Sequence, residues 1–446
     1  MVIERMNNFL FKKASIAPLV IFRIAFGALM FISILRFVLK GWVDTMYVMP
    51  KMHFPYFGLE WIKVLPAEGM YIVFGLLLVS ALFIMFGFLY RVSTILFFLL
   101  FTYIELIDKT NYLNHYYFIS LVSFIIIFIP AGRSFSLDNK FFKRSEFKEV
   151  PYLFLFLLQL QMFVVYFFAG VAKLNYDWLI EAQPLKIWLP AFSHYPIIGQ
   201  FLEDDWVAYL FSWFGCIYDL SIGFLLFNKR TVKFAYTFVI IFHVFTAMFF
   251  NIGMFPYIMM TITIVFFSEG FHQTILNRIK RFVHYNSERE TSVGRANGTL
   301  IYVFVIYFFV QFILPFRYVF YDGDLFWTEQ GYRFSWRVML MEKAGSAFFY
   351  VRDKNTQREI EIDNKEHLTY MQEKMMATQP DMMIDYAKYL KKYYEKKGFV
   401  DAEVRAQSYV TLNGKGSREF IDQTIDLSTQ SNSFLSNKNW VKPYSE

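Results

Sequence analysis

The sequence predicts a polytopic α-helical membrane protein with about nine transmembrane helices and a small C-terminal α+β extramembrane domain. Of the 446 residues, 56% are hydrophobic and 18% are charged, whereas soluble domains carry about 25% charged residues. Apolar runs recur along the chain as far as Phe316, and charged and polar residues become frequent after it. The first part of the chain is therefore predicted to lie in the lipid bilayer, and the second part is predicted to lie in water.

The transmembrane prediction rests on the length of the apolar runs. A helix needs about 20 apolar residues to cross the hydrocarbon core. The third, fourth and eighth runs are short, which is tolerated where a helix lines a cavity instead of lipid. The nine runs are 18–39, 70–89, 94–107, 116–130, 152–172, 206–227, 234–250, 252–267 and 299–316.

The distribution of Lys and Arg predicts the orientation. If the N-terminus is cytoplasmic and the spans alternate, the segments on the cytoplasmic side hold most of the Lys and Arg that lie between spans. This bias is typical of cytoplasmic loops. With nine spans, everything after Phe316 then lies outside the cytoplasm.

Alternating and helical patterns divide the rest of the chain. Residues 347–353 and 358–363 flank a polar turn and predict a hairpin, 367–397 predicts a helix broken near Pro380, and 401–412 and 420–427 alternate like strands. The tail is rich in Ser and Asn, which predicts poor order. The predicted domains are 1–316, 317–427 and a flexible tail at 428–446.

Several function classes are disfavoured. Cys216 is the only cysteine, so the chain can form no internal disulfide and no multi-cysteine metal site, and we predict a buried, inert thiol. The net charge of +7 fits basic cytoplasmic loops, and no nucleic-acid recognition motif accompanies it. Phosphate-binding loops, nucleophile elbows and zinc-protease motifs are absent, and we predict no metal site.

Polar residues in or beside the spans are candidate site residues, because such residues are expensive in a bilayer. In the predicted topology the outer ends of two helices and the outer half of a third carry an amine, an amide and two imidazoles, which predicts one outward-facing cavity suited to proton chemistry. These residues are Lys173, Asn114, His115 and His243.

Structural alternatives stand beside this interpretation. A lysine at a helix end commonly anchors to the interface, and buried histidines commonly make hydrogen bonds between helices. For Arg23 and Asp219 we favour a structural role, in which they pair with each other or with backbone carbonyls.

Five segments in one order then resemble the motifs of a known family. They are 108–110 (DKT) with 114–115 (NH); 168–175 (FAGVAKLN) with 177–178 (DW); 219–226 (DLSIGFLL); His243 with 252–255 (IGMF); and 331–336 (GYRFSW). The chain resembles vitamin K-dependent γ-glutamyl carboxylases, of the horizontally transferred transmembrane domain type found in bacterial homologues.

The resemblance implies carboxylation of peptide glutamate to γ-carboxyglutamate, coupled to oxidation of vitamin K hydroquinone to its epoxide with O2 and CO2. It implies that Lys173 is the base toward the hydroquinone, that His115 assists at the glutamate, and that Asn114 lies beside it. Further candidates for substrate or quinone binding are His243, Lys109, Trp178, Tyr332 and Trp336. For Tyr332 and Trp336, a packed junction between domain and membrane is an equally weighted alternative.

Physical chemistry agrees with these roles. Burial disfavours a charged amine, so a lysine in a membrane cavity becomes a better base. A dry site also protects a carbanion from water until CO2 arrives. Two positions depart from the animal enzymes: Ala172 precedes Lys173 where a second lysine is usual, and Asn175 replaces an aspartate.

The expected partners are an unidentified glutamate-containing peptide or protein, the lipid bilayer and a quinone, with no nucleic acid. We expect a bacterial inner membrane, where menaquinol is the available hydroquinone. The alternative is a quinone- or lipid-binding protein, or a transporter, that shares the fold without carboxylation. The sequence shows no inverted repeat of the kind many transporters carry.

Overall fold

Long apolar helices form the larger part of the chain. The computed structural model describes residues 2–250, 252–285, 291–293, 298–434 and 436–444. Within them, seven helices are long and apolar enough to cross a membrane. They are α2 (Ala17–Leu39), α3 (Ala67–Phe86), α4 (Tyr90–Ile107), α7 (Leu153–Ala172), α10 (Asp205–Phe227), α11 (Val232–Phe249), and α14 (Thr299–Ile313) with its 3-10 extension η7 (Leu314–Phe320).

Two of the nine predicted spans are shorter apolar helices. These are α5 (Asn114–Phe128) and α12 (Phe255–Thr263), which η6 (Ile264–Phe266) continues. The 15 residues of α5 extend about 22 Å, less than the roughly 30 Å of a hydrocarbon core. The helical membrane fold is therefore confirmed with seven candidate spans, and the count of nine is not.

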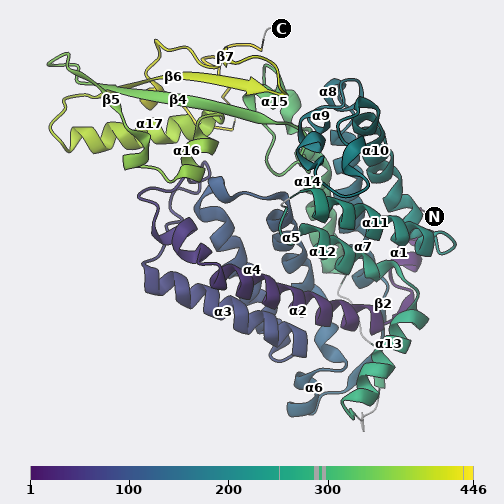
Figure 1. Ribbon diagram of the computed structural model, residues 1–446. Coiled ribbons are helices and arrows are strands. Elements are labelled where there is room, and N and C mark those ends of the chain that lie inside the picture. Colours follow the sequence, from purple (N-terminus) through teal and green to yellow (C-terminus); the bar gives the residue numbers. More distant parts are fainter. Residues whose placement is uncertain (1, 251, 286–290, 294–297, 435, 445–446) are drawn as a thin grey trace.

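The end of the helical domain away from the C-terminal domain carries elements that the sequence did not predict (Figure 1). Strand β2 (Glu146–Pro151) pairs antiparallel with β1 (Lys13–Ser15) and parallel with β3 (Thr291–Val293). Arg23 of α2 is buried near this end, and its guanidinium donates to the carbonyls of Ala131, Ser134 and Phe135. The predicted pairing of Arg23 with backbone carbonyls is confirmed, and its pairing with Asp219 is wrong. The new elements are α1 (Val2–Leu10), β1 (Lys13–Ser15), η3 (Ala131–Arg133), α6 (Leu137–Phe141), β2 (Glu146–Pro151), α13 (Glu269–Phe282) and β3 (Thr291–Val293).

The C-terminal domain is a four-stranded sheet, in the order β5-β4-β6-β7, with two helices between it and the membrane helices (Figure 1). The predicted hairpin and the helix broken at Pro380 are confirmed. Of the two further predicted strands, 401–412 is confirmed as β6, whereas residues 420–427 form no strand of their own and follow the two-residue edge strand β7. The elements are β4 (Lys343–Arg352), β5 (Glu359–Ile362), α16 (Tyr370–Met376), α17 (Pro380–Glu395), β6 (Glu403–Leu412) and β7 (Arg418–Glu419).

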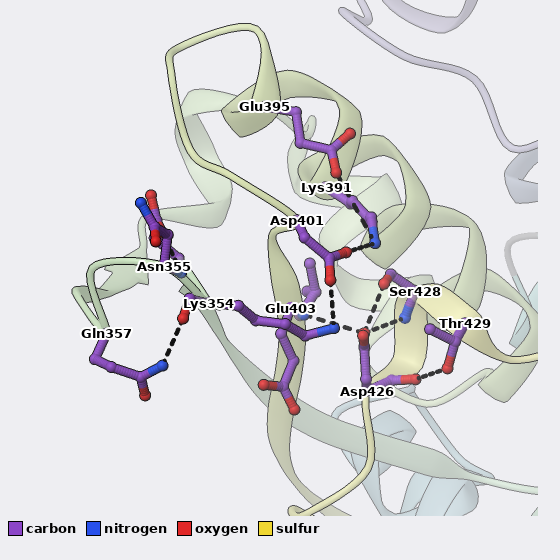
Figure 2. Close-up of polar contacts among 12 residues, drawn as sticks. Lys354, Asn355, Gln357, Lys391, Glu395, Asp401, Glu403, Asp426, Ser428 and Thr429 are labelled. Atoms are coloured by element: carbon purple, nitrogen blue, oxygen red, sulfur yellow. Dashed lines mark hydrogen bonds and ion pairs between the residues drawn. The ribbon is translucent and has the colours of Figure 1, made fainter.

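The described residues of the predicted tail, 428–434 and 436–444, pack against the C-terminal domain. They start in the 3-10 turn η9 (Leu427–Thr429), where Asp426 accepts hydrogen bonds from the backbone and side chain of Ser428 (Figure 2). Further on, Trp440 and Val441 are buried, and Val441 forms a bridge with Ile421. A few buried apolar side chains therefore hold the described part of a segment that is otherwise polar.

Charged side chains join the two domains. The turn η2 (Lys109–Asn111) follows α4, and the Lys109 ammonium lies 2.6 Å from Asp385 and 2.8 Å from Asp381, both on α17. Arg333 also contacts Asp381, at 2.8 Å. Burial would raise the pKa of Asp381, but Arg333 and Lys109 outweigh it and hold that pKa well below its usual range.

Neutralising Asp381 is expected to loosen this junction. Because its pKa is lower in the folded than in the unfolded protein, its ion pairs stabilise the fold above about pH 4 and lose that effect as the pH falls further. At neutral pH, Asp381→Asn should lower the free energy of unfolding by roughly 2 kcal/mol. Unfolding in detergent, followed by circular dichroism across pH, measures this.

The matched control is Asp401→Asn. Asp401 pairs with Lys354 and Lys391 on the exposed side of the same domain (Figure 2). Exposed pairs contribute little, so this variant should unfold like the native protein. Equal stability of Asp381→Asn and Asp401→Asn at neutral pH would contradict a structural role for the junction pairs.

Candidate active site

Lys173 lies at the end of α7 and points into the protein. Its ammonium is 2.6 Å from Asp219 Oδ2 of α10, and both side chains are almost fully buried, at 7% and 5% exposed. It also donates to the carbonyl of Ala169 and lies 5.4 Å from the ring centre of Trp178. Lys173 is therefore an internal ion-pair partner and does not reach the interface as an anchor.

The Lys173–Asp219 pair borders an apolar cavity of about 290 Å³. Helices α7, α10, α11 and α12 and the segment 338–339 contribute its walls. Phenylalanine, leucine, isoleucine and tryptophan side chains dominate the lining, so the few polar groups face a water-poor space. Polar or ionisable lining residues include Lys173, Asp219, His243, Tyr166, Thr246 and Trp178.

His243 lies in the same cavity and is fully buried in α11. Its Nε2 is 3.1 Å from the hydroxyl of Tyr166 on α7, which is the hydrogen bond between helices foreseen as the structural alternative. Its Nδ1 has no hydrogen-bond partner among the described residues. One ring nitrogen therefore fixes the imidazole and the other remains available.

His115 lies behind Phe255 and outside the set of residues that line the cavity. The Phe255 ring centre is 5.8 Å from the ring of His115 and 5.8 Å from the ring of His243. Asn114, at the first turn of α5, donates to the carbonyl of Arg337 and accepts from the hydroxyl of Tyr112. The predicted residues thus divide into Lys173, Trp178 and His243 on the cavity, His115 separated from it by one ring, and Lys109 at the domain junction.

The segment 331–340, here called the junction loop, runs from the C-terminal domain into the helical domain. Its backbone has positive φ at Gly331, Phe334, Trp336 and Met339. Outside glycine this conformation is uncommon and is retained where the surroundings enforce it.

Trp336 is 1% exposed and belongs to the core of the helical domain, where its ring packs at a tilt against Tyr117 of α5, with 5.0 Å between ring centres. Tyr332 is half-buried and contacts Phe326 in the C-terminal domain. These contacts match the packed-junction alternative. The part of the junction loop that reaches the cavity is its second half, through Val338 and Met339.

Asp219 is the site residue that sequence reasoning missed. From the sequence it was assigned a structural pairing role, although its charge in an apolar helix and its place at the start of the 219–226 motif were both signals. It lies 46 positions from Lys173. Gly170 explains how the pair forms, since a Cβ at this position would lie 2.7 Å from the backbone nitrogen of Leu220. Small residues let membrane helices approach closely, and here the approach brings α10 against α7 one residue from Asp219. Cys216, on the same face of α10, is buried as predicted.

Adding a methyl group at Gly170 is expected to disturb the Lys173–Asp219 pair. In Gly170→Ala the two helices must move apart by several tenths of an ångström, so stability should fall by roughly 1–3 kcal/mol. Thermal unfolding in detergent measures this. Gly75→Ala on α3, where a Cβ meets no atom, is the control and should be neutral or slightly stabilising. Equal behaviour of the two variants would show that the close approach is unimportant.

Two matches to known protein families show which family the chain belongs to. The HTTM domain family matches residues 11–271, which includes the helices that build the cavity. The family described as vitamin K-dependent gamma-carboxylase, lumenal domain, matches residues 296–446. A search of solved structures found no match. Both matches agree with the resemblance of the five sequence motifs, and the chain belongs to the vitamin K-dependent γ-glutamyl carboxylase family.

Proposed function

We propose that this protein carboxylates a peptide glutamate to γ-carboxyglutamate, coupled to oxidation of vitamin K hydroquinone to its epoxide with O2 and CO2. Family membership implies these reactants. The observation that supports the proposal most directly is the Lys173–Asp219 pair on the wall of an apolar cavity. Paired titratable groups in a water-poor pocket are typical of acid–base sites.

The cavity has the character that a hydroquinone ring needs. Its volume of about 290 Å³ and its aromatic walls suit a flat apolar group. Trp178 presents its ring beside the Lys173 ammonium, and its indole N–H is fixed by the carbonyl of Ser212. A bound hydroquinone supplies the electrons that reduce O2 and the strong base that deprotonates the glutamate.

Lys173 and Asp219 would act together in moving the first proton. An ammonium and a carboxylate share one excess proton, and in a low-dielectric cavity that proton can reside on either partner. When Asp219 holds it, the neutral Nζ of Lys173 accepts a proton from the hydroquinone hydroxyl. His243, with its free Nδ1, is then a candidate hydrogen-bond partner for the second quinol oxygen.

Asn114 and His115 would help to position the reacting glutamate and to keep bulk water away from it. Asn114 ties the first turn of α5 to the junction loop through the carbonyl of Arg337. No hydrogen bond to another described residue occupies the imidazole of His115, and the residue is 8% exposed. A buried imidazole beside an apolar cavity offers a proton-transfer group without admitting bulk water.

We propose a bacterial inner membrane as the location, with the N-terminus in the cytoplasm. The helix α13 supports this orientation, because its last turn carries Lys280 and Arg281 at the end of the molecule away from the C-terminal domain (Figure 1). The C-terminal domain would then face outward, where it meets an exported glutamate-containing protein. Menaquinol dissolved in the bilayer would be the hydroquinone.

The deciding experiment measures both products at once. The protein is purified in detergent and mixed with vitamin K hydroquinone, labelled bicarbonate and a short glutamate-containing peptide. Epoxide and labelled peptide, formed in equal amounts, are the expected result. Epoxide without labelled peptide would mean that the protein oxidises the hydroquinone but does not accept this peptide as its substrate. Quinone binding with neither product would favour the alternative, a non-carboxylating quinone-binding protein.

A further inference from the structure

A second, strongly charged pocket lies where the C-terminal domain meets the membrane helices. Its volume is about 70 Å³, which suits an anionic head group better than a whole amino acid. The described tail closes one side of it, with Phe434 against Phe57 at 5.5 Å. Its charged lining residues are Lys109, Arg317, Glu329, Arg333, Asp381 and Lys438.

Most of these charges are balanced by a neighbour. Lys109 and Arg333 share Asp381, and Lys109 also contacts Asp385. Glu329 pairs with Lys343, a nearly buried lysine just outside the pocket. These ion pairs leave no net charge on the wall that they form.

Two cations remain without a carboxylate partner in the part of the chain that the structure describes. Lys438 is 9% exposed and its ammonium lines the pocket without an ion pair or an acceptor. Burial lowers the pKa of Lys438, and although Asp381 opposes this, the nearby Lys109 and Arg333 lower it further. Arg317 donates one hydrogen bond to the carbonyl of Arg333 and has no carboxylate partner either.

A buried ammonium without a counter-ion is costly, so this arrangement favours an anion that enters from outside. The arginine fork and the lysine together match a carboxylate, which accepts charge-assisted hydrogen bonds from both. Aromatic rings from Tyr56, Phe57 and Phe334 exclude part of the solvent and strengthen such bonds.

We propose that this pocket binds an acidic side chain of the peptide substrate, distinct from the glutamate that reacts. The proposal rests on the proposed function, because it assumes a peptide substrate. The reacting glutamate needs the apolar cavity, whereas this pocket is polar and charged. The junction loop connects them, since Phe334 lines the pocket and Met339 lines the cavity. A peptide that crosses the loop would place one acidic residue in each.

The test compares two peptides that differ at one position near the reacting glutamate, where one carries Asp and the other Asn. For the native protein, KM should be at least about tenfold lower for the Asp peptide, with kcat unchanged. In Lys438→Met the difference should vanish, and in Lys438→Arg it should persist. Lys392→Met, a surface change on α17, should behave like the native protein.

Binding without turnover separates this proposal from the proposed function. Fluorescent forms of both peptides, with Gln at the reacting position, are titrated into native and Lys438→Met protein in detergent. Preferential binding of the Asp form that is lost in Lys438→Met supports the pocket even where no carboxylation occurs. Equal binding of both peptides to the native protein, or a preference that survives in Lys438→Met, overturns it. So does a Lys438-dependent binding of anionic phospholipid vesicles with no effect on either peptide.

Discussion

Replacing Lys173 with Met should abolish both epoxide formation and peptide carboxylation. Methionine keeps the length and apolar character of the side chain but removes the amine that faces the cavity beside Asp219. Loss of a general base lowers the rate by roughly 100- to 10,000-fold. Because the proton transfer at Lys173 would precede both products, the two rates should fall together. The double assay with hydroquinone and labelled bicarbonate measures them.

The control for this variant must show that the cavity of the Lys173→Met protein still binds a quinone. Native and Lys173→Met protein should bind the oxidised quinone equally well, measured by quenching of tryptophan fluorescence, because Trp178 and Trp188 line the cavity. Lys186→Met, which removes an exposed pair with Asp205 nearby, should keep full activity. Activity of Lys173→Met within a few-fold of the native value would refute the assignment of the base.

Replacing Asp219 alone should strongly destabilise the helical domain. In Asp219→Leu the ammonium of Lys173 is left buried without its partner, and breaking a buried pair from one side typically costs about 3–5 kcal/mol. The double variant Lys173→Met/Asp219→Leu replaces both charges by apolar groups, so it should recover most of the lost stability while staying inactive. Thermal unfolding in one detergent compares the four proteins.

This cycle tests the geometry independently of catalysis. A strong coupling between the two positions is expected only if the side chains touch in the folded protein. Additive effects of the two substitutions would mean that Lys173 and Asp219 are not paired. The proposal that the two side chains share a proton would then be contradicted as well.

The membrane helices could be predicted because a helix that crosses the bilayer needs a long run of apolar residues. Each long helix, α2 and α14 among them, coincides with an apolar run that spans the hydrocarbon core. The short amphipathic α13 was missed because its pattern is polar on one face and is interrupted by basic residues. Lys173, His115 and His243 were found because ionisable residues are rare in spans, and the family motifs contain the same three residues.

Contacts between distant segments were not predictable from one sequence. The pairing of Lys173 with Asp219 depends on the close approach at Gly170, which no local pattern encodes. Lys109 belongs to a sequence motif beside His115, yet its side chain turns to Asp385 of the other domain. Its partner is 276 positions away, and only the folded arrangement reveals it.

The junction loop has a consequence for biogenesis. Trp336 completes the core of the helical domain, yet it is synthesised after every apolar helix of that domain. The chain must therefore be synthesised as far as Trp336 before α5 can make its contact with this residue. Until then the ring of Tyr117 lacks its contact with Trp336. The core of the helical domain is therefore complete only once the segment after its last apolar helix has been translated.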